Sequence, residues 1–140
     1  MSELLHRIKV FLYRMEGAEP RYLQLKPDQG YEALWGPVQG DLGFGDQLDT
    51  AIRRRVIEDV GVLQPGPLLD LDMPSRWTIG DEEIVEWNFG VQLRVDPDPA
   101  VIEQHWAAHR WAGFAVAYPT MGLEFDRAAI MRLHTLLLAA

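Results

Sequence analysis

Residues Gly40–Val62 read GDLGFGDQLDTAIRRRVIEDVGV, a glycine-rich loop followed by a helical pattern. Apolar residues recur at helical spacing after the loop, at Leu48, Ala51, Ile52, Val56 and Val60. The spacing predicts an amphipathic helix that Asp46 or Asp49 could cap at its start and Gly61 could end. A glycine loop lets a ligand approach the backbone closely, and the helix behind it holds carboxylates on one side. We therefore expect the chemistry of this protein in this segment.

Strand patterns surround this segment. In Val85–Val95 apolar residues alternate with polar ones, which predicts a half-buried strand with one face in the core and the other toward water or a cleft. A terminal helix is predicted over Asp126–Ala139, with Asp126 as its cap. Further strands are predicted over Ile8–Met15 and Arg21–Lys26, which form a hairpin, and around His109–Ala112, and the short aromatic segment Tyr31–Val38 leads into the loop. These elements indicate a mixed sheet sandwiched by helices, in the α/β (α+β) class.

Length and charge limit the function. A chain of 140 residues is expected to form one domain, residues 1–140. Its formal net charge of −8 would repel a phosphate backbone, so we expect no nucleic acid polymer as a partner. The absence of Cys excludes disulfides, thiolate metal sites and a Cys nucleophile. No apolar run is long enough to cross a membrane and Met1–Val10 has no signal-peptide pattern, so we expect a cytoplasmic protein with no membrane partner.

Charged residues cover the outer face of the predicted helix. Glu58 and Asp59 are adjacent carboxylates, and hard oxygen ligands of this kind suit Mg²⁺ or Mn²⁺, which recruit substrate phosphates. The same pair could equally be a solvated helix face. The run Arg53–Arg55 could pair with carboxylates one turn away, which we favour for Arg53, while Arg55 could also bind a substrate phosphate.

The segment resembles the Nudix box, the loop–helix–loop pattern Gly-x5-Glu-x7-Arg-Glu-apolar-x-Glu-Glu-x-Gly-apolar. The positions that match without a gap are Gly40, Asp46, Arg54, Val56, Glu58, Asp59, Gly61 and Val62, with Asp in place of Glu at positions 46 and 59. Arg55 departs from the pattern, because the family has a metal-ligating glutamate there. Either the metal site is weakened or another carboxylate replaces the missing one, the donors outside the box being Glu82, Glu83, Glu86 and Glu103.

The likeness extends beyond the box, over roughly residues 6–138. The tail, His109–Phe114 with Phe125–Ile130 beyond it, is similar to the ending of dihydroneopterin triphosphate and dATP pyrophosphohydrolases. In those proteins a Glu-His pair precedes this strand, and its glutamate helps to bind metal. His105 and Trp106 occupy the corresponding positions in this chain.

The resemblance implies a Nudix-type α/β/α sandwich and a pyrophosphohydrolase. The family hydrolyses a pyrophosphate bond in a nucleoside triphosphate or other nucleoside diphosphate derivative, using Mg²⁺ or Mn²⁺. Carried over by position, Glu58 and Asp59 would be catalytic metal ligands and Arg54 would orient a carboxylate. Asp46 would steady the loop, and Gly40 would allow its turn beside the substrate.

Aromatic and histidine residues add further candidates. Trp77, in a predicted loop, is the better candidate for stacking on the base of a substrate, whereas Trp87 and Trp111 are expected in the core. His105 and His109 have a spacing that could chelate zinc on a helix. The glutamate of a His-Glu-x-x-His motif is absent, however, and His109 begins a predicted strand, so we do not favour this site.

Three functions remain open at this point. The first is a Nudix-type hydrolase with reduced or altered activity, indicated by the retained carboxylates. The second is a catalytically inactive Nudix domain that binds a nucleotide ligand or a protein partner, indicated by Arg55, His105 and Trp106. The third is a structural or interaction protein that keeps only the fold, in which the run Leu136–Leu138 forms helix core or a homodimer surface.

Overall fold

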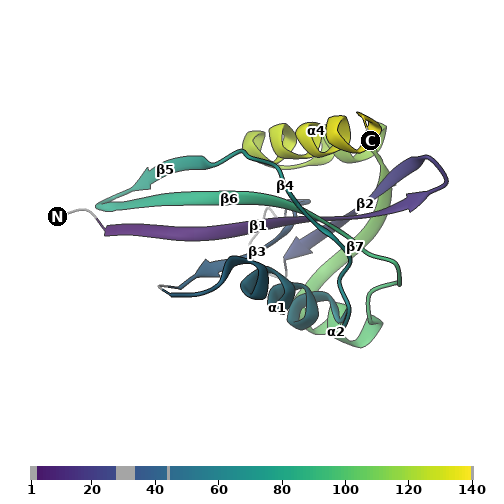
Figure 1. Cartoon of the computed structure of the whole chain (residues 1–140), viewed down its shortest axis with the longest axis horizontal. Coiled ribbons are helices and arrows are strands. Elements are labelled where there is room, and N and C mark those ends of the chain that lie inside the picture. Colours follow the sequence, from purple (N-terminus) through teal and green to yellow (C-terminus); the bar gives the residue numbers. More distant parts are fainter. Residues whose placement is uncertain (1–2, 28–33, 44, 140) are drawn as a thin grey trace.

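The computed structural model describes residues 3–27, 34–43 and 45–139. Figure 1 shows a central sheet with helices on both faces, α4 on one side and α1 and α2 on the other. The helices are α1 (Leu48–Val60), α2 (Pro99–His105), α3 (Phe114–Thr120) and α4 (Glu124–Ala139). The strands are β1 (Glu3–Glu16), β2 (Glu19–Pro27), β3 (Val38–Leu42), β4 (Leu68–Asp70), β5 (Ser75–Ile79), β6 (Glu82–Gln92) and β7 (Trp106–Gly113).

The sheet is mixed, as the sequence predicts. Its two longest strands, β1 and β6, run parallel at its centre, with His6 beside Val85 and Tyr13 beside Gln92. On the side of β1 away from β6, the first half of β1 pairs antiparallel with β3 and the end of β1 pairs antiparallel with β2. Strand β7 follows β2, and β4 and β5 both pair with β6. Because helices cover both faces of the sheet, its central strands bury side chains on both sides.

Two hydrophobic cores lie on the two faces of the sheet. Alternate residues of β1 and β6, such as Ile8 and Phe89, pack with Ile52 of α1 on one face. The intervening residues of β1, such as Phe11, pack with Ile130 of α4 on the other face. The terminal leucines belong largely to this second core, because Leu136 and Leu137 pack against it and Leu138 is exposed.

The prediction that β6 has one face toward water or a cleft is wrong for most of the strand. Glu86 and Asn88, on the polar face of the alternating pattern, are 3% and 2% exposed. They are covered because β6 lies inside the sheet and the α4 layer packs on that face.

A buried ion cluster joins β1, β6 and α4. Lys9 Nζ lies 2.7 Å from Asp126 Oδ1 and 3.4 Å from Glu86 Oε1, and all three side chains are at most 4% exposed. Trp77 Nε1 donates to Glu86 Oε1 at 2.9 Å. Burial raises the pKa of the Asp126 carboxyl, and the Lys9 ammonium opposes that rise. Asp126 thus lies in the first turn of α4 and ties this helix to the sheet, instead of capping it.

Helix α1 begins and ends where the hydrophobic spacing predicts. Gly61 has a φ of 74°, the left-handed conformation expected of a glycine that ends a helix. The predicted cap is wrong, because Gln47 is the N-cap residue and makes no side-chain cap bond. Asp46 instead accepts a 2.7 Å hydrogen bond from the Gly43 amide in the preceding loop. Residues 31–33 of the predicted aromatic segment lie outside the described residues.

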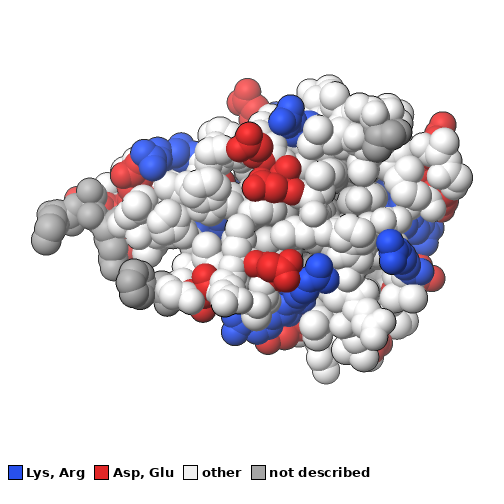
Figure 2. All heavy atoms as spheres, viewed as in Figure 1, with Lys and Arg blue, Asp and Glu red and all other residues white. Residues whose placement is uncertain are grey.

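Among the described residues, no helix is long and apolar enough to cross a membrane. On the face drawn in Figure 2, acidic and basic side chains lie next to one another over α1. The helix carries three consecutive arginines together with Asp49, Glu58 and Asp59, so the two charge signs compensate locally.

Replacing Lys9 with Met should destabilise the protein by about 3–5 kcal/mol, because two buried carboxylates would lose their cation. Urea denaturation measures this loss. Lys26→Met is the matched control, since Lys26 is partly exposed and lies 4.6 Å from the Trp35 ring centre, a contact worth about 0.5–1 kcal/mol. Equal losses in the two variants would contradict the assigned role of the ion cluster.

Candidate functional site

Gly40 and Arg55 bring β3 and α1 together. Gly40 lies within β3, opposite Ile8 of β1, and not in a turn as its place in the box implies. A Cβ atom at Gly40 would lie 2.5 Å from Arg55 Cδ and 3.3 Å from Cγ. The missing side chain therefore provides the space that the aliphatic part of Arg55 occupies.

The guanidinium group of Arg55 contacts both box carboxylates. Nη2 hydrogen bonds to Glu58 Oε2, and Nη1 lies 3.6 Å from Asp59 Oδ1. Glu58 follows Arg55 by three residues and Asp59 by four, so all three side chains share one side of the helix. The side chain of Asp59 is 14% exposed, against 31% for Arg55 and 50% for Glu58. One cation is thus shared by two carboxylates at the edge of the core.

Asp59 is also bordered by the end of α2 and the start of β7. Burial raises the pKa of its carboxyl, the positive charges of Arg55 and His105 act in the opposite direction, and Glu58 raises it further. Trp106 Nε1 donates a 2.9 Å hydrogen bond to the backbone carbonyl of Asp59. His105 and Trp106, which the sequence places where a Glu-His pair is expected, therefore both lie beside Asp59.

This arrangement does not fit Mg²⁺ or Mn²⁺, because a guanidinium group is already ion-paired with the two carboxylates that would hold the ion. Within the described residues, no three His, Cys, Asp or Glu side chains are grouped so that they could hold a metal. The replacement donors do not complete a site. Glu86 binds Lys9 on the opposite face of the sheet, Glu83 pairs with Arg76, and Glu82 and Glu103 are exposed outside any such group.

The other two arginines of α1 differ from Arg55. Arg53 Nε hydrogen bonds to both carboxylate oxygens of Asp49, at 3.2 and 3.0 Å, which confirms the structural pairing predicted for it. Its Nη1 also donates to the Pro65 carbonyl at 2.9 Å. Arg54 is exposed and makes no ion pair with a described residue. Of these three arginines, therefore, only Arg55 forms ion pairs with Glu58 and Asp59, the carboxylates expected to act in the site.

A pocket of about 830 Å³ lies beside the β3–α1 loop. Much of its surface is apolar, contributed by Leu4, Leu42, Leu48, Trp87 and Phe89. His6, Asp41 and Asp70 add polar groups, and no described Lys or Arg lines it. The pocket lies on the α1 face of the sheet, because Phe89 belongs to the core on that side.

Trp87 belongs to this pocket, and the prediction that it lies in the core is wrong. Its side chain is 36% exposed, and its Nε1 donates to His6 Nδ1 at 3.1 Å. The two rings are stacked with centroids 6.2 Å apart. Trp77 lies on the other face of the sheet, bound to Glu86, and does not line the pocket. Both residues alternate with polar neighbours, so their sequence contexts did not reveal which face each would occupy.

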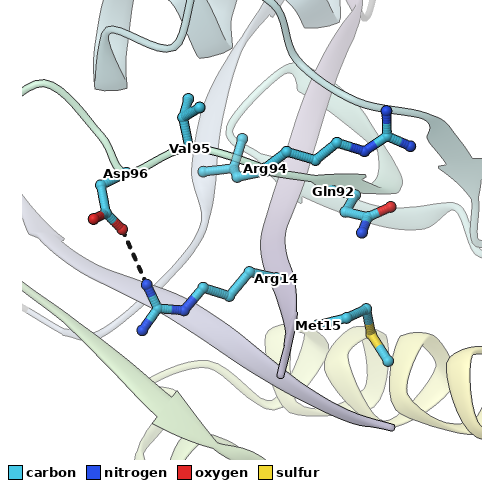
Figure 3. A pocket seen from close by; sticks show the side chains of 7 residues that line it. Arg14, Met15, Gln92, Arg94, Val95 and Asp96 are labelled. Atoms are coloured by element: carbon cyan, nitrogen blue, oxygen red, sulfur yellow. Dashed lines mark hydrogen bonds and ion pairs between the residues drawn. The ribbon is translucent and has the colours of Figure 1, made fainter. Parts of the chain in front are cut away.

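A second, smaller pocket lies at the opposite end of β1 and β6 (Figure 3). Its volume is about 360 Å³. Arg14 reaches toward Asp96, 3.0 Å away, whereas Arg94 extends in a different direction. Arg14 also pairs with Glu16 and stacks over Trp111. These arginines do not converge on one point, so the pocket lacks the geometry of an anion site.

Comparison with known proteins identifies the fold. No family model matches the chain, and no curated protein matches it in sequence. Among solved structures, the E. coli dihydroneopterin triphosphate pyrophosphohydrolase aligns with a TM-score of 0.76 and 20% identity, over 94% of this chain and 95% of that one. A C. elegans Ap4A hydrolase binary complex aligns with a TM-score of 0.73 and 12% identity, over 97% and 99%.

A third solved structure is the NUDIX domain of Shewanella oneidensis NrtR complexed with ADP ribose. It aligns with a TM-score of 0.67 and 16% identity, over 99% of this chain and 86% of that one. The chain therefore has the Nudix hydrolase fold, with a mixed sheet between helices. At these identities the likeness establishes the fold, and the resemblance predicted from the box is confirmed at that level.

Replacing Arg55 with Met should raise the pKa of Asp59 further, because the largest influence that lowers it is removed. Carboxyl-carbon NMR titration measures this pKa directly. The matched control is Arg54→Met, which removes the same charge from the neighbouring, exposed position and should change the Asp59 pKa less. An unchanged pKa in Arg55→Met would contradict the ion pair.

Proposed function

We propose that this protein binds a nucleotide-like small molecule, with the flat ring of the ligand in the pocket beside α1. The observation that carries the proposal is the composition of that pocket, which is lined by an exposed indole, aliphatic side chains and three polar side chains. Ligand pockets in proteins are typically apolar with a few polar groups that fix orientation.

The pocket chemistry favours a heteroaromatic ring. The ring would stack on Trp87, which His6 holds in place through its hydrogen bond to the indole nitrogen. Asp70 could accept a hydrogen bond from a ring N–H or amino group, because a carboxylate only accepts. Asp41 and Asp70 line the pocket, and none of the described lining residues is Lys or Arg. The phosphates of such a ligand would therefore lie outside the pocket.

A binding role without turnover is consistent with the ion pairs of Arg55, which occupy the carboxylates that a metal-dependent hydrolase would use. The similar NrtR structure supports the same role, because it is a NUDIX domain complexed with ADP ribose. We therefore use ADP-ribose as the first probe for this chain.

Replacing Trp87 with Ala should weaken ADP-ribose binding by about 1–3 kcal/mol, the usual loss when a stacking aromatic is removed. Isothermal titration calorimetry measures the affinity. Trp77→Ala is the matched control, because it removes an indole from the opposite face of the sheet and should leave the affinity unchanged. A loss confined to Trp77→Ala would place the ring of the ligand on the other face and contradict the proposal.

Hydrolysis of the ligand is the second candidate function. Glu58 favours it, since this residue keeps its place in the box and its side chain is 50% exposed on α1. The fold shared with the E. coli dihydroneopterin triphosphate pyrophosphohydrolase also makes a pyrophosphohydrolase plausible. In that case Mg²⁺ or Mn²⁺ would be the metal, and Arg55 would have to leave the carboxylates.

A turnover assay separates the two candidates. The protein is incubated with a panel of nucleoside triphosphates and diphosphate derivatives in Mg²⁺ or Mn²⁺, and release of phosphate or pyrophosphate is measured. We expect no turnover above that of Glu58→Gln, because Arg55 is ion-paired with both box carboxylates. Metal-dependent turnover that Glu58→Gln abolishes would establish the hydrolase instead.

A further inference from the structure

We propose that Arg55 is the cation of this site in place of a divalent metal, and that its guanidinium group contacts the phosphate of a ligand bound beside α1. The statement about phosphate rests on the proposed ligand-binding function, whereas the statement about the metal rests on Arg55 and its two carboxylates alone. The protein would then bind a nucleoside diphosphate compound without any metal.

Arg55 is held in position at both its stem and its end. Its aliphatic part fills the space left by Gly40, and its two terminal nitrogens contact Glu58 and Asp59. A side chain fixed at both its stem and its end loses little entropy when it binds a ligand, which is the condition for an effective binding group. A mobile surface arginine would lack this advantage.

The guanidinium group of Arg55 has more N–H donors than its two carboxylate partners use. The group has five N–H bonds, and one contact from each Nη leaves several of them for a further acceptor. Arg55 is 31% exposed, so an anion can approach it from solvent. Guanidinium matches phosphate in geometry and can donate two parallel hydrogen bonds to it.

Arg55 lies on the side of α1 that borders the pocket. Leu48 lines the pocket, and Arg55 follows it by two turns on the same side of α1, about 10 Å along the helix axis. A ligand whose ring lies against Trp87 could therefore extend a sugar and its phosphates along α1 toward Arg55. This explains how a pocket lined by acidic and apolar residues could belong to the site of an anionic compound.

The metal part of the proposal is tested without any nucleotide. Mn²⁺ is titrated into the wild-type protein, Arg55→Glu and Arg94→Glu, and free Mn²⁺ is followed by electron paramagnetic resonance. Arg94→Glu is the control for the charge change, because Arg94 follows the far end of β6. We expect Arg55→Glu to bind Mn²⁺ at least about tenfold more tightly than the other two proteins. Stoichiometric Mn²⁺ binding by the wild type, as tight as that of Arg55→Glu, would overturn the proposal.

The phosphate part is tested by calorimetry in EDTA, with ADP-ribose and inorganic pyrophosphate as probes. Arg55→Met should weaken both by about tenfold or more, because a charge-assisted contact is lost, and Arg94→Met should weaken neither. Arg55→Met keeps the aliphatic part of the side chain, so circular dichroism should show an intact fold. Unchanged affinities in this variant, or wild-type binding that requires Mg²⁺, would overturn the role of Arg55.

The outcomes also separate this inference from the proposed function. If ADP-ribose binds and Trp87→Ala weakens it while Arg55→Met does not, the ligand-binding function stands and the role of Arg55 is wrong. If the wild type binds pyrophosphate through Arg55 but shows no added affinity for ADP-ribose, the ring pocket and with it the proposed function are wrong.

Discussion

The contact of Arg55 with Gly40, Glu58 and Asp59 determines the chemistry of this site. It depends on a glycine in β3, because any side chain at that position would displace the arginine stem. It places one positive charge between two carboxylates that would otherwise repel each other across neighbouring positions of a helix. A helix surface suited by sequence to a divalent ion thus carries an ion-paired cluster, in which the remaining N–H donors of the guanidinium can bind an anion.

The opposite face of the sheet uses the same arrangement in a buried setting. Lys9 lies between Glu86 and Asp126, and this cluster attaches α4 to the centre of the sheet. The surroundings give the two clusters different roles. The Lys9 cluster is almost fully buried and leaves no room for a ligand, so it serves the fold, whereas the Arg55 cluster is partly exposed near a pocket and can take part in binding. Trp87 and Glu86 are adjacent on β6, so Trp87 faces the pocket and Glu86 faces the Lys9 cluster.

The sequence predicted local structure well wherever the periodicity of apolar residues was strong. Helical spacing located α1, the ending at Gly61 and the pairing of Arg53 with Asp49, because these depend on residues within two turns of each other. It could not show that the polar face of β6 is buried, since a period of two does not reveal whether a helix covers that face. The short elements β4, β5, α2 and α3 have too few residues for a periodic signal. The pocket was missed because its walls come from four distant segments, and Trp87 carried no local sign of it.

The guanidinium group of Arg55 occupies the place between Glu58 and Asp59, and the proposed chemistry of the site depends on it. A crystal structure of the wild-type protein grown with a high concentration of MnCl₂, with diffraction data collected at the manganese absorption edge, tests this directly. We predict continuous electron density for Arg55 between the two carboxylates and no anomalous peak beside them. An anomalous peak from manganese bound by Glu58 and Asp59, with Arg55 turned toward solvent, would contradict this assignment. It would favour a metal-dependent hydrolase instead.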